Sequence, residues 1–180
     1  MLSGSVSRRY ARAILLIGEQ NQNYDILASE IDRLAATYDK SVELRSVLEN
    51  PAFSSAQRQG VLDELSRRLM LSRTIHNFAS LLLTRNRLSA LPGIARHLRL
   101  LVDEQAGRVR ARVTSARPLD TATETRIAIA IGKATGRAVL LEKQIDPALI
   151  GGVVTQVGDL VYDGSLATEL QQMRDRWLQT

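Results

Sequence analysis

Apolar residues recur at helical spacing along the N-terminal part of the chain. Val6, Tyr10, Ala13, Ile14 and Ile17 follow the i, i+4, i+7, i+8 and i+11 spacing that places side chains on one face of an α-helix. Polar breaks separate this stripe from five more of the same kind. The pattern therefore predicts six helices, which cover approximately residues 5–17, 24–38, 42–48, 54–69, 72–86 and 89–105.

Local capping signals predict where three of these helices begin. Ser5 and Ser72 each precede an apolar stripe, and a serine there can accept a hydrogen bond from a free backbone N–H of the first turn. Ser54, followed three residues later by Gln57, matches the capping box, in which the two side chains satisfy each other's backbone N–H groups.

The pattern changes after the sixth helix. Residues 108–113 read Arg-Val-Arg-Ala-Arg-Val, and this alternation with a period of two predicts a β-strand. Thr121 and Glu124 form a second capping-box pattern, which predicts a helix that ends at Gly136, since glycine is favoured just after a helix. The apolar run 138–141 predicts another strand.

A hairpin and a final helix are predicted at the C-terminal end. Gly151 and Gly152 are expected where the backbone angles are unusual or two chains pass closely. Gly158-Asp159 lies between two apolar runs and is typical of a type II′ hairpin turn. The segment 163–165, Asp-Gly-Ser, is expected to end the second strand and cap a helix. The apolar stripe of that helix is Leu166, Leu170, Met173 and Trp177.

The order of these elements predicts an α + α/β protein with two domains. Residues 1–106 are expected to form a six-helix bundle, and residues 107–180 a smaller domain in which a short β-sheet is combined with two helices. The 180 residues, of which 44% are hydrophobic, are enough for two small cores. Because aromatic residues make up only 4%, these cores must be filled by aliphatic side chains.

Composition also excludes several classes of protein. The chain contains no cysteine, which rules out disulfides, thiol nucleophiles and cysteine-based zinc sites. Its longest apolar runs are far shorter than the ~20 residues that a membrane-spanning helix needs. The N-terminal residues lack the apolar region of a signal peptide, and their arginines are interpreted as part of the first helix.

The net charge of +5 is compatible with nucleic acid, an anionic membrane or an acidic protein as the partner. Arg108, Arg110 and Arg112 share one face of a predicted strand and are candidates for contacts with phosphate. No aromatic residues alternate with them to provide a surface on which bases stack. A basic nucleic-acid-binding protein is kept as the alternative function, and an exposed strand face or an acidic protein partner accounts for the same residues.

No residue pattern predicts a catalytic centre, a cofactor or a metal. His76 and His97 have no histidine or carboxylate at i+3 or i+4 with which to hold a metal. Gly132-Lys133 lacks both the earlier glycine and the following serine or threonine of a phosphate-binding loop. A small hydrolase or transferase remains a third hypothesis. The acidic residues it would use are more simply explained as turn residues: Asp146, Asp159 and Asp163.

The first and fifth predicted helices are candidates for a protein-binding surface. Ala11, Leu15 and Leu16 extend the apolar surface of the first helix beyond its main stripe, and Leu81 lies outside the core face of the fifth. A helix that is apolar nearly all round is either buried or binds a partner. The pattern alone leaves both interpretations open.

Three segments carry a resemblance to a known family. Residues 145–166, IDPALIGGVVTQVGDLVYDGSL, combine a strand end, a Gly-Gly break, a hairpin and a helix start. Residues 9–13, RYARA, and residues 86–92, NRLSALP, lie before it in the chain. In order and spacing they resemble the δ subunit of bacterial F-type ATP synthases, the OSCP family, over nearly the whole chain.

The resemblance implies a non-catalytic stator subunit without a cofactor. In such a protein, residues 1–106 bind the catalytic head and residues 107–180 bind the b subunits of the peripheral stalk, so that the head resists the torque of the rotor. The first and fifth helices border a groove that receives the N-terminal helix of an α subunit. The positions that match this groove, with Ile14 added from the apolar stripe, are Tyr10, Ala13, Ile14, Asn77 and Leu81.

The resemblance also implies where the protein works. Nucleic acid is not expected as a partner, and the membrane is expected to be contacted only indirectly, through the complex. The expected location is the cytoplasmic face of the bacterial plasma membrane, as a peripheral subunit.

Overall fold

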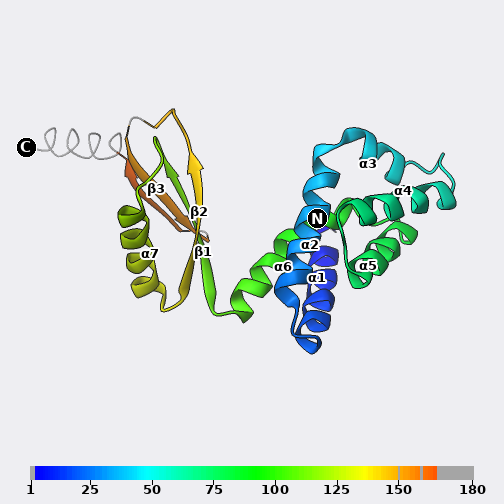
Figure 1. Ribbon diagram of the computed structural model, residues 1–180, viewed down its shortest axis with the longest axis horizontal. Coiled ribbons are helices and arrows are strands. Elements are labelled where there is room, and N and C mark those ends of the chain that lie inside the picture. Colours follow the sequence, from blue (N-terminus) through cyan, green and yellow to red (C-terminus); the bar gives the residue numbers. More distant parts are fainter. Residues whose placement is uncertain (1–2, 150, 159, 166–180) are drawn as a thin grey trace, which may run out of the picture. The chain divides into compact units, whose positions relative to one another are not determined.

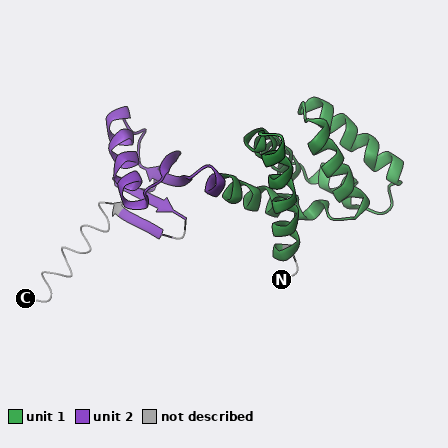
Figure 2. Ribbon diagram, turned by 90° about the horizontal axis from the view of Figure 1, so that it is seen from below, with its two compact units in different colours: residues 1–102 green, residues 103–180 purple. Residues whose placement is uncertain are grey.

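The computed structural model describes residues 3–149, 151–158 and 160–165, and it divides into two compact units (Figure 2). Unit 1 comprises residues 1–102 and unit 2 comprises residues 103–180. The division lies in the last turn of a helix, at Val102–Asp103, slightly before the expected boundary at residues 106–107. Asp103 is the first residue of unit 2, and its side chain forms ion pairs with Arg108 and Arg110 of the same unit.

Unit 1 is entirely helical within the described residues, and the six predicted helices are confirmed (Figure 1). A single aliphatic core joins them, with Leu27, Ile31, Leu34, Ile75 and Leu98 among its fully buried side chains. A short 3-10 turn, η1, precedes the last helix, which therefore begins two residues later than expected. The elements are α1 (Ser3–Gln20), α2 (Tyr24–Lys40), α3 (Val42–Glu49), α4 (Ser55–Arg68), α5 (Arg73–Thr84), η1 (Leu88–Ala90) and α6 (Leu91–Gln105).

Two of the three predicted N-caps in unit 1 are confirmed. The Ser54 hydroxyl accepts a hydrogen bond from the Gln57 N–H, and the Gln57 side chain accepts one from the Ser54 N–H, so the capping box is complete. The Ser72 hydroxyl accepts from the N–H of Ile75. The prediction for Ser5 is wrong, because α1 already includes Ser3 and Ser5 lies in its first turn.

The buried face of α1 is not the one that the apolar stripe indicated. The residues that face the core are Ser7, Ala11, Ile14, Leu15 and Gly18, and Ile14 is the only member shared with the predicted stripe. Most of these residues are small, and that allows close approach of neighbouring chain. A Cβ added at Gly18 would lie 2.6 Å from the Cα of Tyr24. The buried face of α1 is therefore defined partly by how closely the neighbouring chain packs, which a hydrophobicity pattern does not report.

A buried carboxylate joins α2 to the beginning of α5. Glu30 is almost fully buried, and its Oε2 accepts hydrogen bonds from the Ser72 N–H at 2.9 Å and from the Ser72 hydroxyl at 2.6 Å. A negative charge at the N-terminus of a helix is also favoured by the helix dipole. Glu30 therefore fixes where α5 starts, although 42 residues separate it from Ser72.

Removing this carboxylate is expected to destabilise unit 1. Glu30→Ala leaves the partly buried Ser72 N–H without its acceptor, and such a loss costs about 1–3 kcal/mol. Glu30→Gln retains an acceptor oxygen and is expected to cost less. Chemical denaturation of both variants measures the difference. Glu64→Gln, which removes an exposed ion-paired carboxylate, is the matched control and is expected to change stability by less than about 0.5 kcal/mol.

Within the residues that the structure describes, unit 2 contains a mixed four-stranded sheet in the order β2-β1-β3-β4, with one helix, α7, on one face (Figure 1). β1 and β2 are parallel and are joined through α7, whereas β3 pairs antiparallel with both β1 and β4. Ile127 and Ile131 of α7 pack with Val109, Ala111 and Val139 of the strands. The elements are β1 (Arg108–Ser115), α7 (Thr121–Thr135), β2 (Ala138–Ile145), β3 (Gly152–Val157) and β4 (Leu160–Ser165).

The predicted sheet and first helix of this domain are confirmed, with some changes at their ends. Asp120, rather than Thr121, caps α7, and its carboxylate accepts from the Thr123 N–H at 3.0 Å. This hydrogen bond lowers the pKa of Asp120. Gly136 ends α7 with the left-handed φ of 67° that favours glycine.

The hairpin is confirmed as a pair of antiparallel strands. Gly152 has the positive φ, 82°, that the Gly-Gly pair suggested. The segment 163–165 was expected to end the second strand, and β4 ends at Ser165. Asp163 was interpreted as a turn residue, but it lies within β4 and pairs with Val154 across the ladder. Asp159 and the predicted final helix with Leu166, Leu170, Met173 and Trp177 lie outside the described residues.

Candidate protein-docking site

The described residues contain no group of three or more His, Asp and Glu side chains that could hold a metal ion. His76 lies near one carboxylate, with its Nε2 at 3.6 Å from Oδ1 of Asp63, on the outer surface of α4 and α5. None of the described helices is long and apolar enough to cross a membrane.

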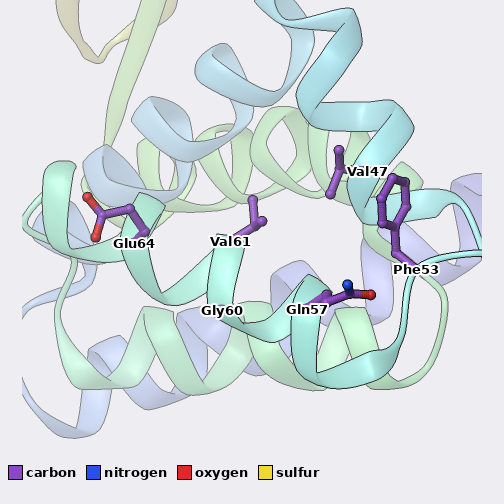
Figure 3. A pocket seen from close by; sticks show the side chains of 6 residues that line it. All are labelled: Val47, Phe53, Gln57, Gly60, Val61 and Glu64. Carbon is purple, nitrogen blue, oxygen red and sulfur yellow. The ribbon is translucent and has the colours of Figure 1, made fainter.

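An open hollow of about 480 Å³ lies beside α4 in unit 1 (Figure 3). Gln57, Val61 and Glu64 of α4 line one side, and Val47 and Phe53 lie across from them. The polar side chains are Gln57 and Glu64, and each already has partners: Gln57 in the capping box and Glu64 in ion pairs with Arg67 and Arg68. The hollow is therefore an apolar depression without converging polar groups that would orient a small ligand.

The arginines of β1 are engaged within unit 2. Arg108 donates to Asp103 at 2.8 Å, and Arg110 donates to Asp103 and, at 3.0 Å, to Glu142. Arg112 lies 4.0 Å from the same Glu142. These carboxylates are the acidic contacts of the strand face, and they belong to the same chain. The arginine face, one of the two observations that motivated the nucleic-acid alternative, is thus accounted for by internal ion pairs.

The first and fifth helices meet through an aromatic contact. The rings of Tyr10 on α1 and Phe78 on α5 are 6.0 Å apart and nearly perpendicular, the edge-to-face arrangement that aromatic pairs prefer. Phe78 is buried in the core, whereas Tyr10 is only partly buried and borders the surface. The contact therefore brings α1 and α5 together at Tyr10 and Phe78.

The predicted site residues occupy different depths on these two helices. Ala13 and Asn77 are exposed, and Leu81 is 45% exposed. Tyr10 is partly buried against Phe78. Ile14 is only 2% exposed and lies in the core, so it supports the surface from beneath.

The outer face of α1 is more apolar than the predicted residues alone suggested. Leu16 is 54% exposed and Ile17 is 37% exposed, and both lie on the half of α1 that follows Ala13. Leu16, Ile17 and Leu81 are thus large apolar side chains exposed on the two helices that the sequence pattern singled out as candidates for a protein-binding surface. Ile17 was expected on the core face because the apolar stripe was drawn through the larger side chains. The small residues on the opposite face, which are in fact buried, were not considered.

An all-helical unit with exposed apolar side chains on α1 and α5, joined to a small α/β unit, defines a two-domain protein of the helical-bundle plus α/β class. The family model of the ATP synthase delta (OSCP) subunit matches residues 6–176. The chain is 44% identical to the ATP synthase subunit delta of Anaeromyxobacter dehalogenans (strain 2CP-C) over 174 residues, which is 97% of each chain. It is 40% identical to that of Myxococcus xanthus (strain DK1622) over 176 residues and 38% identical to that of Geobacter metallireducens over 175, again covering 97% of each chain.

The fold is also found in a solved structure. A chain of the Toxoplasma gondii mitochondrial ATP synthase hexamer superposes with a TM-score of 0.68 at 19% identity, covering 96% of this chain and 97% of that one. The chain belongs to the ATP synthase delta (OSCP) subunit family. It is a non-catalytic stator component of F-type ATP synthase, and its role lies in proton-driven ATP synthesis by that complex.

Proposed function

We propose that residues 1–106 hold the catalytic head of the synthase by binding the N-terminal helix of an α subunit on the outer faces of α1 and α5. The observation that carries this proposal is the exposed apolar surface beside the Tyr10–Phe78 contact, which includes Leu16, Ile17 and Leu81. An amphipathic helix buries its own apolar face on a surface of this kind. Tyr10 is suited to act as an anchor, since it combines a large apolar ring with a polar hydroxyl.

Residues 107–180 are proposed to bind the b subunits of the peripheral stalk. The edge strand β4 supports this role, because Leu160, Val161 and Tyr162 are all exposed on it. Alternating side chains of a strand point to opposite faces, so apolar surface is available on both sides of this edge. With one domain on the head and the other on the stalk, the protein prevents the head from turning with the rotor.

The proposed location is the cytoplasmic face of a bacterial plasma membrane, where the subunit is peripheral and reaches the membrane only through the complex. This is supported by full-length similarity to delta subunits of several bacteria.

The direct test is calorimetric titration of the full chain with a synthetic peptide of the N-terminal segment of the cognate α subunit. One-to-one binding with a negative heat-capacity change is expected, because apolar surface becomes buried on both partners. A peptide with the same composition in scrambled order, which loses the apolar face of the helix, is the control. If the folded protein does not bind the native peptide, the outer faces of α1 and α5 are not the docking site.

A further inference from the structure

The positive charge of the protein is concentrated in unit 1. Residues 1–102 contain 14 Lys and Arg against 9 Asp and Glu, whereas residues 103–180 contain 10 of each. The whole net charge of +5 therefore belongs to the unit that carries the proposed docking surface. A partner of this unit is expected to be acidic, since complementary potentials accelerate association and favour the correct partner.

Within unit 1, the N-terminal half of α1 carries basic side chains and no acidic ones. It carries Arg8, Arg9 and Arg12, and the sequence has no Asp or Glu before Glu19. Arg8 and Arg12 are four residues apart, so their like charges lie on one side of the helix and destabilise it. In the part of the chain that the structure describes, none of the three arginines is found in an ion pair. This contrasts with Arg99 of the same unit, which pairs with Asp32.

Arg9 and Arg12 precede the apolar residues of the proposed docking surface on α1, whereas Arg8 lies on the opposite side of the helix from Ile17 and donates to the Gly4 carbonyl. The guanidinium carbon of Arg9 is 5.7 Å from the centre of the Tyr10 ring, and that ring in turn contacts Phe78 of α5. Arg9 precedes Ala13 by four residues, as Arg12 precedes Leu16, so each pair shares one side of the helix. The exposed surface of α1 is thus basic in its first half and apolar in its second.

We infer that the helix bound on α1 and α5 is acidic at one end, with its carboxylates on Arg9 and Arg12 and its apolar residues on Ala13, Leu16, Ile17 and Leu81. This inference rests on the proposed function and adds the chemistry and the orientation of the partner. Like-charged side chains one helical turn apart are unfavourable, and the arginines of α1 have this arrangement. Carboxylates of a bound partner would neutralise their charges and so reduce the repulsion between them. The arginines then select an acidic amphipathic helix over an uncharged one.

The experiment compares Arg9→Gln/Arg12→Gln with Arg33→Gln/Arg96→Gln in the full chain. Both double variants remove two positive charges from exposed arginines of unit 1, but the second pair lies on α2 and α6. The probe is the cognate α-subunit N-terminal peptide, used in its native form and with every Asp and Glu replaced by the amide. The variants are expected to fold, because removing like-charge repulsion does not destabilise α1.

The first double variant is expected to bind the native peptide about 10-fold more weakly and to lose most of the salt dependence, whereas the second changes affinity less than about twofold. The amide peptide is expected to bind wild type and the first variant equally. Equal losses in both variants, or full affinity in the first, would overturn the inference while leaving the docking site intact. Binding of wild type to anionic vesicles that is lost in Arg9→Gln/Arg12→Gln, with no preference of wild type for the native peptide over the amide peptide, would overturn it in favour of a lipid surface. Absence of any peptide binding by wild type would instead reject the proposed function.

Discussion

Leu81→Asp is expected to weaken binding of the α-subunit peptide by at least about 100-fold. A carboxylate placed against the apolar face of the bound helix must be removed from water without a partner, which costs several kcal/mol, and every ~1.4 kcal/mol is a factor of ten in affinity. Leu81 is half-exposed in the free protein, so the same change has little effect on folding. Titration calorimetry and a thermal denaturation of the same sample measure the two effects separately.

Tyr10→Asp is expected to produce a comparable loss of binding, accompanied by some loss of stability because the Tyr10 ring also packs on Phe78. Ile26→Asp is the matched control, since Ile26 is an apolar side chain of α2 that is 61% exposed. It is expected to leave affinity unchanged. If Leu81→Asp binds as tightly as wild type while Ile26→Asp does not, the docking surface lies on α2 and the assignment to α1 and α5 is wrong.

Features that depend on a few neighbouring residues were predictable from the sequence. The capping box of Ser54 and Gln57 needs only two side chains three positions apart, and it is present as expected. The positive φ of Gly136 follows from its place just after a helix. The helix pattern and the alternation of the strands are local in the same sense, and they gave the correct fold class for the described residues.

Features that depend on distant residues were not predictable in this way. The buried face of α1 is defined by Ser7, Ala11 and Gly18, which are inconspicuous on a hydrophobicity scale and important only because other segments pack closely against them. The contact of Glu30 with Ser72 joins residues far apart in the sequence. The charge pattern along β1 likewise gave no indication of which carboxylates its arginines meet.

The candidate site was predictable from the sequence only in part. The resemblance named Tyr10, Asn77 and Leu81, and the structure brings their helices together through the Tyr10–Phe78 contact. Leu16 and Ile17 were missed as surface residues for the same reason that the face of α1 was misassigned. The exposure of Leu16 and Ile17 could be recognised only once the structure showed that the small residues on the opposite side of α1 are the buried ones.

Asp103→Asn is expected to destabilise unit 2, because Asp103 is the shared partner of two arginines of β1. Asp103 has a side chain that is 8% exposed, and it accepts hydrogen bonds from both Arg108 and Arg110. Asp103→Asn preserves the size of the side chain but turns an NH2 group or an uncharged oxygen toward two guanidinium groups. The expected cost is about 2–3 kcal/mol, less than for a fully buried pair, because Arg108 and Arg110 still reach water.

Hydrogen exchange of the β1 amides, residues 108–115, measures this effect within unit 2, and the amides of α2 and α5 serve as an internal reference in unit 1. Arg112→Gln is the control variant, since Arg112 is more exposed and lies 4.0 Å from its carboxylate, so it is expected to change exchange in β1 only slightly. The double variant Asp103→Asn/Arg110→Gln is expected to be less destabilised than the sum of the two single variants, because the second change removes a charge that the first left unpaired. Strict additivity of the two changes would show that Asp103 stabilises β1 by its shape and not by its charge.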